Sequence, residues 1–94
     1  MTSKQRAVLR GMANTLEPIL YIGKDGIVPG TIRQADDDLE AHELIKCCVQ
    51  QGCPLTAREA VTALCEELGA EPVQCIGRRF VMFRPSREHP QIII

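Results

Sequence analysis

The chain has 94 residues, of which 45% are hydrophobic and 24% are charged, and its formal net charge is −1. This length suits one domain with one core, and the composition is that of a soluble globular protein. No apolar run is long enough to span a membrane, and no apolar stretch follows the charged first residues, so neither a membrane span nor a secretory signal is expected. We therefore expect a single domain over residues 1–94, with an irregular tail from about residue 85.

The first predicted helix begins near Ser3, which together with Thr2 can cap it. Apolar residues then recur at helical spacing. The helix ends before Pro18, because proline excludes the preceding residue from the helical region. Ile19–Ile22 follows as a short strand and leads into the loop Gly23–Gly26.

A second helix is predicted from Pro29, a residue suited to the first helical position. Acidic residues crowd its second half, where the negative end of the helix dipole makes them unfavourable. Glu43–Val49 is predicted to be an interior strand, because most of its positions are apolar. A capping box over Thr56–Glu59 begins the third helix, and Gly69 is well placed to end it.

The last two predicted strands, Pro72–Ile76 and Phe80–Arg84, are joined by the turn Gly77–Arg79. The element order is therefore α-β-α-β-α-β-β. Strands separated by helices favour parallel neighbours with right-handed crossovers, whereas a hairpin is antiparallel. We expect an α/β fold of the two-layer α+β kind, with helices packed on a four-stranded mixed sheet.

Five cysteines form an odd set without a C-x-x-C pair, which argues against a disulfide framework and thiol redox catalysis. His42, Cys47, Cys48 and Cys53 carry zinc-ligand atoms, but adjacent strand residues point to opposite faces. We expect reduced thiols, a cytoplasmic location, no metal, no cofactor and no catalytic residue.

The strongest functional signal is the G-x-x-G loop. Two glycines three residues apart let the backbone turn tightly and expose its N–H groups. These groups, the start of the following helix and one lysine would form a seat for a phosphate. A plain strand-to-helix turn is the alternative. The predicted RNA contacts in this loop are Gly23, Lys24, Asp25 and Gly26, although the acid at position 25 would weaken phosphate attraction.

Charge is unevenly distributed along the chain. Residues 1–33 hold five basic and two acidic side chains, residues 34–71 hold two and nine, and residues 72–94 hold four and one. Two basic ends that meet in the fold would form a basic face, and a merely solvated surface is the alternative. The candidate cations are Lys4, Arg6 and Arg10 on the first helix, and Arg78 and Arg79 in the hairpin turn. Arg6, Arg10, Arg78 and Arg79 are expected to form one patch with Lys24.

Aromatic side chains are scarce, with one tyrosine, two phenylalanines and no tryptophan. Tyr21, Phe80 and Phe83 could stack on bases. In a chain this poor in aromatics, strand positions favour a role in the core.

The ordered set of motifs resembles the CRM domain, a family named for chloroplast RNA splicing and ribosome maturation, in its bacterial YhbY-like form. The motifs are Ser3–Arg6, Leu9-Arg10, Pro18, Ile22–Gly26, Glu43–Lys46, Ala57–Glu59, Val73–Val81 and Phe83–Pro85. The resemblance implies a fold like the C-terminal domain of translation initiation factor three. It also implies RNA binding without catalysis, with the G-x-x-G loop as an RNA contact. Val28–Gly30 departs from the family, whose members usually begin the second helix with a capping threonine.

The resemblance further implies association with precursors of the large ribosomal subunit. We expect a monomeric, non-enzymatic protein that binds ribosomal RNA during 50S assembly, with neither a membrane nor a small molecule as partner. The alternative is a protein-interaction module whose acidic helix docks a basic ribosomal or assembly partner.

Overall fold

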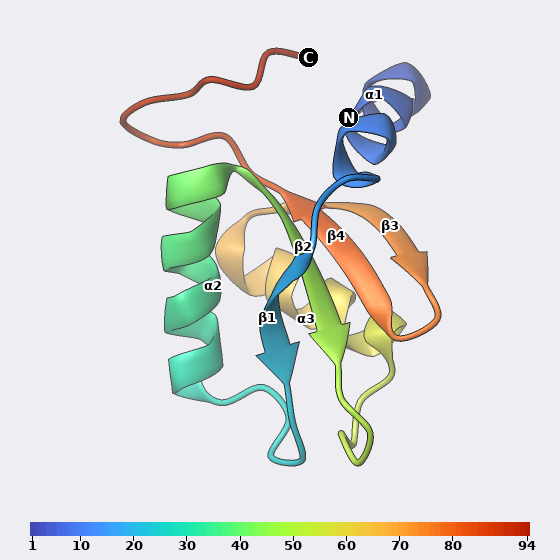
Figure 1. Cartoon of the computed structure of the whole chain (residues 1–94). Helices are drawn as coiled ribbons and strands as arrows, with labels where there is room; N and C mark the ends of the chain where they lie inside the picture. Colours follow the sequence, from blue (N-terminus) through green and yellow to red (C-terminus); the bar gives the residue numbers. More distant parts are fainter.

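A computed structural model describes residues 1–94 (Figure 1). The order of helices and strands matches the predicted α-β-α-β-α-β-β. The elements are α1 (Ser3–Ala13), β1 (Pro18–Ile22), α2 (Pro29–His42), β2 (Leu44–Val49), α3 (Ala57–Leu68), β3 (Glu71–Ile76) and β4 (Arg79–Phe83). β2 begins one residue later than predicted, because Glu43 has a φ of 66° and turns the chain between α2 and the strand.

The four strands form one mixed sheet in the order β1-β2-β4-β3. β1 and β2 are parallel, whereas β4 is antiparallel to both β2 and β3. The predicted fold class is confirmed. This topology brings the carboxyl ends of β1 and β2 and the β3–β4 turn to the same end of the sheet, at the bottom of Figure 1.

Helices cover the two faces of the sheet unequally. α2 and α3 pack on one face and bury the larger core, which includes Leu39, Leu64 and Phe80. α1 lies on the other face, where Leu9 contacts a smaller cluster that includes Leu44 and Phe83. Leu44 begins β2 and Phe83 ends β4, so α1 covers only the end of the sheet far from the β3–β4 turn (Figure 1).

The predicted start and end of the third helix are confirmed. The Thr56 hydroxyl accepts from the N–H of Glu59 (3.1 Å), and the Glu59 carboxylate accepts from the N–H of Thr56 (2.9 Å). Gly69 ends the helix in the left-handed region at φ 65°, which glycine adopts without a Cβ clash. The capping box therefore fixes the direction in which α3 leaves the loop that follows β2.

The aromatic residues divide between the core and the surface. Phe80 and Phe83 are buried, as predicted, with exposed fractions of 1% and 3%. The prediction is wrong for Tyr21, whose exposed fraction is 53%. Tyr21 lies at the end of β1 that α1 does not reach, on the face opposite α2 and α3.

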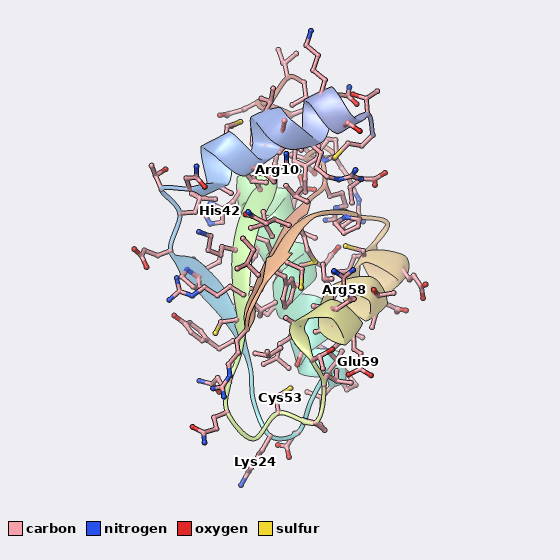
Figure 2. The ribbon with its side chains drawn as sticks, turned by 90° about the vertical axis from the view of Figure 1, so that its right-hand side faces the viewer. Arg10, Lys24, His42, Cys53, Arg58 and Glu59 are labelled. Carbon is pink, nitrogen blue, oxygen red and sulfur yellow. The ribbon has the colours of Figure 1, made fainter.

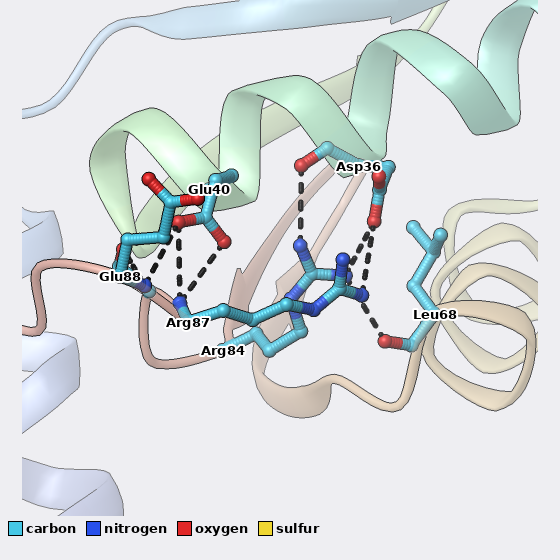
Figure 3. A network of polar contacts seen from close by, with 7 residues as sticks. Asp36, Glu40, Leu68, Arg84, Arg87 and Glu88 are labelled. Carbon is cyan, nitrogen blue, oxygen red and sulfur yellow. Dashed lines mark hydrogen bonds and ion pairs between the residues drawn. The ribbon is translucent and has the colours of Figure 1, made fainter.

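The C-terminal tail, Pro85–Ile94, contains no helix or strand but is held against the end of α2. The Glu43 carboxylate accepts the N–H groups of Ser86, Gln91 and Ile92 at 2.8–3.0 Å. Glu40 accepts the N–H of Arg87 at 3.0 Å (Figure 3). Glu40, one of the acidic residues that looked unfavourable in the second half of α2, therefore binds the tail together with Glu43, which follows the helix.

Candidate nucleic-acid interface

Three connections meet where β1 and β2 end, and we call them the loop end: residues 23–28, 50–56 and 77–78. The N–H of Gln50 donates to the carbonyl of Ile22 (2.8 Å), which joins the first two connections. The N–H of Val49 donates to the carbonyl of Arg78 (2.8 Å), which joins the hairpin turn to β2. These two hydrogen bonds hold the three connections side by side, although the connections are far apart in the sequence.

The two glycines of the G-x-x-G loop are constrained to different degrees. The N–H of Gly26 donates to the carbonyl of Gly23 (3.0 Å), closing a tight turn. Gly26 has a φ of 68°, a conformation that other residues rarely adopt. A Cβ at Gly23 would lie 3.2 Å from Oε1 of Gln50, so a side chain there would require the end of the Gln50 side chain to shift by a few tenths of an ångström.

Lys24 and Asp25 occupy the exposed tip of this turn, and neither side chain makes a hydrogen bond or an ion pair. Figure 2 shows Lys24 projecting from the bottom of the molecule. Asp25 does not cap α2, because the residue at the N-cap is Val28, whose N–H donates to Oγ1 of Thr31 (3.3 Å). The loop therefore offers one unpaired cation beside one unpaired anion.

The start of α2 offers fewer free N–H groups to an anion than its position after the G-x-x-G loop suggested. Pro29 has no N–H, and the N–H groups of Thr31 and Ile32 both donate to the carbonyl of Val28. Gly30 is left as the free donor of the first turn. Attraction for a phosphate at this loop consequently depends mainly on Lys24 and the exposed turn.

Arg78 and Arg79 are both exposed. Arg78 follows Gly77, which has a φ of 60°, and borders a hollow of about 270 Å³ between the hairpin turn and the β2–α3 loop. Arg79 begins β4 and pairs with Cys48 and Ile76 on the neighbouring strands. Both arginines lie at the same end of the sheet as Lys24.

The basic residues of α1 lie elsewhere. Arg10 is at the top of the molecule in Figure 2 and Lys24 at the bottom. Arg6 donates from Nε to the carbonyl of Pro72 (3.3 Å) and so helps to hold α1 on β3, while Lys4 is exposed. The hypothesis of one patch is wrong for α1, because its apolar face packs where β2 begins and β4 ends.

One cation at the sheet was missed by sequence reasoning. Lys46 is half-buried in the middle of β2, in a strand taken as interior. Its burial alternates with that of its neighbours: Ile45 and Cys47 enter the larger core, whereas Lys46 and Cys48 face the other side. The polar residue in an otherwise apolar run was the available signal for a face open to solvent.

The acidic helix is partly occupied within the chain. Asp36 forms ion pairs with Arg84 (2.8 Å) and Arg87 (3.5 Å), and Glu40 binds the N–H of Arg87 in the tail (Figure 3). Glu43 also binds the tail. These contacts engage Asp36 and Glu40, two of the four acids within α2, whereas Asp37 is exposed and makes no ion pair. The acidic surface open to a basic protein partner is therefore smaller than the sequence suggests.

The cysteines are all free thiols. Burial raises the pKa of Cys65 to about 12, and burial likewise raises the pKa of Cys47 well above its ordinary value. Such thiols stay protonated and are poor nucleophiles and metal ligands. No three side chains of His, Cys, Asp or Glu are grouped so that they could hold a metal ion. None of the helices combines the length and apolar character needed to cross a bilayer.

Comparisons with known proteins agree with this architecture. Residues 1–84 match the model of the CRS1 / YhbY (CRM) domain. The chain is 38% identical over 92 residues to the Bacillus subtilis protein named "Probable RNA-binding protein YqeI", covering 98% of this chain and 96% of that one. It is 34% identical over 88 residues to a Haemophilus influenzae protein named "RNA-binding protein", covering 94% and 89%.

A solved structure has the same fold. The solution structure of the hypothetical protein SAV1595 from Staphylococcus aureus superposes with a TM-score of 0.74 at 39% sequence identity. The match covers 100% of this chain and 98% of that one. The fold is therefore shared over the length of the two chains.

Proposed function

The chain belongs to the CRS1 / YhbY (CRM) domain family, and from this premise we propose that it binds RNA, without catalysing a reaction, through phosphate contacts at the loop end. The observation that carries the proposal is the convergence of Lys24, Arg78 and Arg79 at one end of the sheet. None of these side chains takes part in an ion pair, because both ion pairs of the molecule lie on Asp36. Unpaired cations on neighbouring loops attract a polyanion jointly.

The G-x-x-G turn gives the loop a shape suited to a nucleic-acid backbone. Gly23 and Gly26 keep the turn narrow, so a phosphate can approach the main chain as well as Lys24. In another RNA-binding module a G-x-x-G loop clamps the nucleotide backbone. Contacts of this kind position an RNA without reading its bases.

α1 provides a second, separate region for phosphate contacts. Lys4 and Arg10 are exposed, whereas Arg6 is shared with Pro72. An RNA that reached both regions would run along the longest dimension of the domain, about 36 Å. We propose that a structured RNA, rather than a short strand, fills both.

Ribosomal RNA in precursors of the large subunit is the proposed natural ligand, on the basis of the family membership. The five free thiols support the cytoplasm as the place of action, since its reducing conditions keep cysteines reduced. Crosslinking the protein to RNA in living cells and sequencing the attached fragments tests this choice. Enrichment of large-subunit precursor sequences is expected, and recovery of unrelated messenger RNA alone would contradict it.

Binding itself is tested by titrating the full chain with a large-subunit RNA fragment at increasing salt. A phosphate-driven complex loses affinity steeply, with a slope of about −0.7 to −0.9 for each phosphate contact. We expect a slope that corresponds to several contacts. The protein-docking alternative predicts little binding to naked RNA at any salt concentration.

A further inference from the structure

A row of four side chains crosses the whole sheet on the face that α2 and α3 do not cover. Tyr21 pairs with Cys48, Cys48 pairs with Arg79, and Arg79 pairs with Ile76. Paired residues on neighbouring strands point to the same side of a sheet. The row therefore runs from β1 to β3 on one face, and Lys46 lies on that face two residues before Cys48.

This row is open to solvent. Tyr21 and Ile76, at its two ends, have exposed fractions of 53% and 65%. α1 and the tail residue Ile92 contact Leu44 and Phe83, at the other end of the sheet, and in Figure 1 no helix lies in front of the lower half of the strands. Lys46, Arg79, Gln74 and Ile76 border a hollow of about 220 Å³ in this face, and Asn14, at the end of α1, lies at its edge.

Within the four strands, the charge of the open face has a single sign. β1, β2 and β4 contain no acidic residue, and the one acid of β3, Glu71, pairs with Phe83 at the end near α1. Outside the strands, Glu17, just before β1, borders a hollow together with Lys46. Lys46 and Arg79 make no ion pair. A flat surface with unpaired cations around an exposed aromatic ring is complementary to a nucleic acid strand with accessible bases.

We propose that this face is a second contact surface for RNA, specific for unpaired nucleotides: a base stacks on Tyr21 while Lys46 and Arg79 hold neighbouring phosphates. This inference rests on the proposed function. Adjacent strands are about 4.8 Å apart, so the backbones of Tyr21 and Arg79, two strands apart, are separated by about 10 Å. Tyr21 also lies two residues before Gly23. An RNA strand bound at the G-x-x-G turn can therefore continue directly onto the ring of Tyr21.

The requirement for unpaired RNA follows from stacking chemistry. In a duplex both faces of each internal base are covered by neighbouring bases, so a protein ring has no free base to stack on. A single strand can turn its bases toward the sheet. The loop end, by contrast, contacts phosphates and accepts either form of RNA.

The composition of the chain allows a direct test, because Tyr21 is its only tyrosine and it has no tryptophan. Intrinsic fluorescence therefore reports on this one ring. The full chain is titrated with a short single-stranded oligoribonucleotide and, separately, with the same strand annealed to its complement. We expect quenching by the single strand, saturating together with binding measured by anisotropy, and no quenching by the duplex.

Substitutions give a second readout. Tyr21→Phe keeps a ring and should retain affinity, whereas Tyr21→Val keeps a good strand residue without a ring. Loss of one stacked base should weaken single-strand binding by about 5- to 150-fold and leave duplex binding unchanged. Lys46→Gln should reduce the salt slope for the single strand by about 0.7. Ile93→Ala, at an exposed position in the tail, is the matched control and should change neither the affinity for the single strand nor the salt slope.

The outcomes separate this inference from the proposed function. If the duplex binds with a steep salt slope but the single strand leaves Tyr21 fluorescence unchanged, the sheet-face site is wrong and RNA binding at the loop end stands. If Tyr21→Phe weakens single-strand binding as much as Tyr21→Val, stacking is wrong. If neither RNA binds, RNA binding itself is wrong, and the open face is better explained as a protein contact.

Discussion

At the scale of single residues, Lys24 offers the simplest test of the loop end. Its side chain stands at an exposed tip without a partner, so Lys24→Ala should leave the fold intact. Losing one phosphate contact should lower the magnitude of the salt slope by about 0.7–0.9. Arg33→Ala, at an exposed position on α2, is the control. Equal slopes for the variant and the wild-type protein in a filter-binding titration would remove Lys24 from the interface.

Asp25 is the only acidic residue in the three segments of the loop end. Because its carboxylate caps nothing, replacing it removes repulsion without removing a structural hydrogen bond. Asp25→Lys should tighten RNA binding and steepen the salt slope by about 0.7–0.9, at an unchanged melting temperature. Asp37→Lys makes the same charge change at an exposed position on α2. A gain of equal size in both variants would mean that net charge, rather than the loop, determines affinity.

Residues at the surface of the sheet show where prediction from sequence fails. The sequence favours a core position for Tyr21, because strand aromatics are usually buried, and the apolar residues around Lys46 hide the exposure of its face. Both follow the two-residue alternation of their strands, so the pattern was present in the sequence. Which face is left uncovered, however, depends on where α1 packs, and that is decided by a cluster that joins Leu9 to residues as distant in sequence as Phe83.

At the scale of elements, the capping box of α3 is a stability feature distinct from the proposed RNA site. Thr56→Ala removes the acceptor for the N–H of Glu59 and should lower the free energy of unfolding by about 1 kcal/mol. Thr62→Ala on the same helix is the control, because alanine is the better helix former at an interior position and no cap is lost. Thermal denaturation of both variants measures the difference. Identical melting temperatures for Thr56→Ala and the wild type would show that the cap contributes nothing.

The tail is an element that only the structure reveals. Glu43 holds a φ of 66°, which is strained for a residue with a side chain, while its carboxylate binds three N–H groups of the tail. Sequence patterns describe neighbours along the chain. The pairing of Glu40 and Glu43 with residues more than 40 positions later has no periodic signal, so the acids at the end of α2 looked unfavourable.

This anchoring predicts a pH dependence. Burial raises the pKa of Glu43, but the N–H donors of Ser86, Gln91 and Ile92 outweigh it, and the pKa lies below the ordinary 4.5. The N–H of Arg87 and the hydroxyl of Ser86 likewise lower the pKa of Glu40. A carboxylate with a lowered pKa stabilises the fold above its unfolded-state pKa and loses that effect as the pH falls through the folded-state value. The stability from the tail should therefore be complete above about pH 5 and decline below about pH 4.5.

Glu43→Gln isolates this contribution. The amide cannot carry the charge that strengthens the three hydrogen bonds, so the free energy of unfolding at neutral pH should fall by about 1–2 kcal/mol. The loss of stability on acidification should become shallower than in the wild type. Chemical denaturation over a pH series measures both quantities. A variant with unchanged acid dependence would assign the effect to another carboxylate.

At the scale of the whole molecule, element order, the parallel β1–β2 pair and the antiparallel β3–β4 hairpin followed from the alternation of helices and strands. The position of β4 between β2 and β3 did not, because chain order does not say on which side of β2 the hairpin will pair. The arrangement of the charges did not follow. Basic residues at both ends of the sequence suggested one patch, yet α1 and the loop end lie at opposite ends of a domain 36 Å long. Chain order alone does not say which end of the sheet a terminal helix will cover.

Because the two basic regions are separated, the affinity for RNA should depend on the length of the RNA, which would not be expected for a single patch. Reversing Arg78 and Arg79 to glutamate should weaken binding of every RNA, and more strongly than neutralising them to glutamine, because reversal adds repulsion to the lost attraction. Reversing Lys4 and Arg10 should weaken only RNAs long enough to reach α1 from the loop end. Arg6 is left intact in this comparison, since its bond to Pro72 supports the position of α1. The measurement compares the affinities for a short oligonucleotide and for a long precursor fragment. If the α1 reversal weakens binding of the two RNAs equally, the two basic regions act as one electrostatic field. If it weakens binding of neither RNA, the basic residues of α1 only solvate the surface.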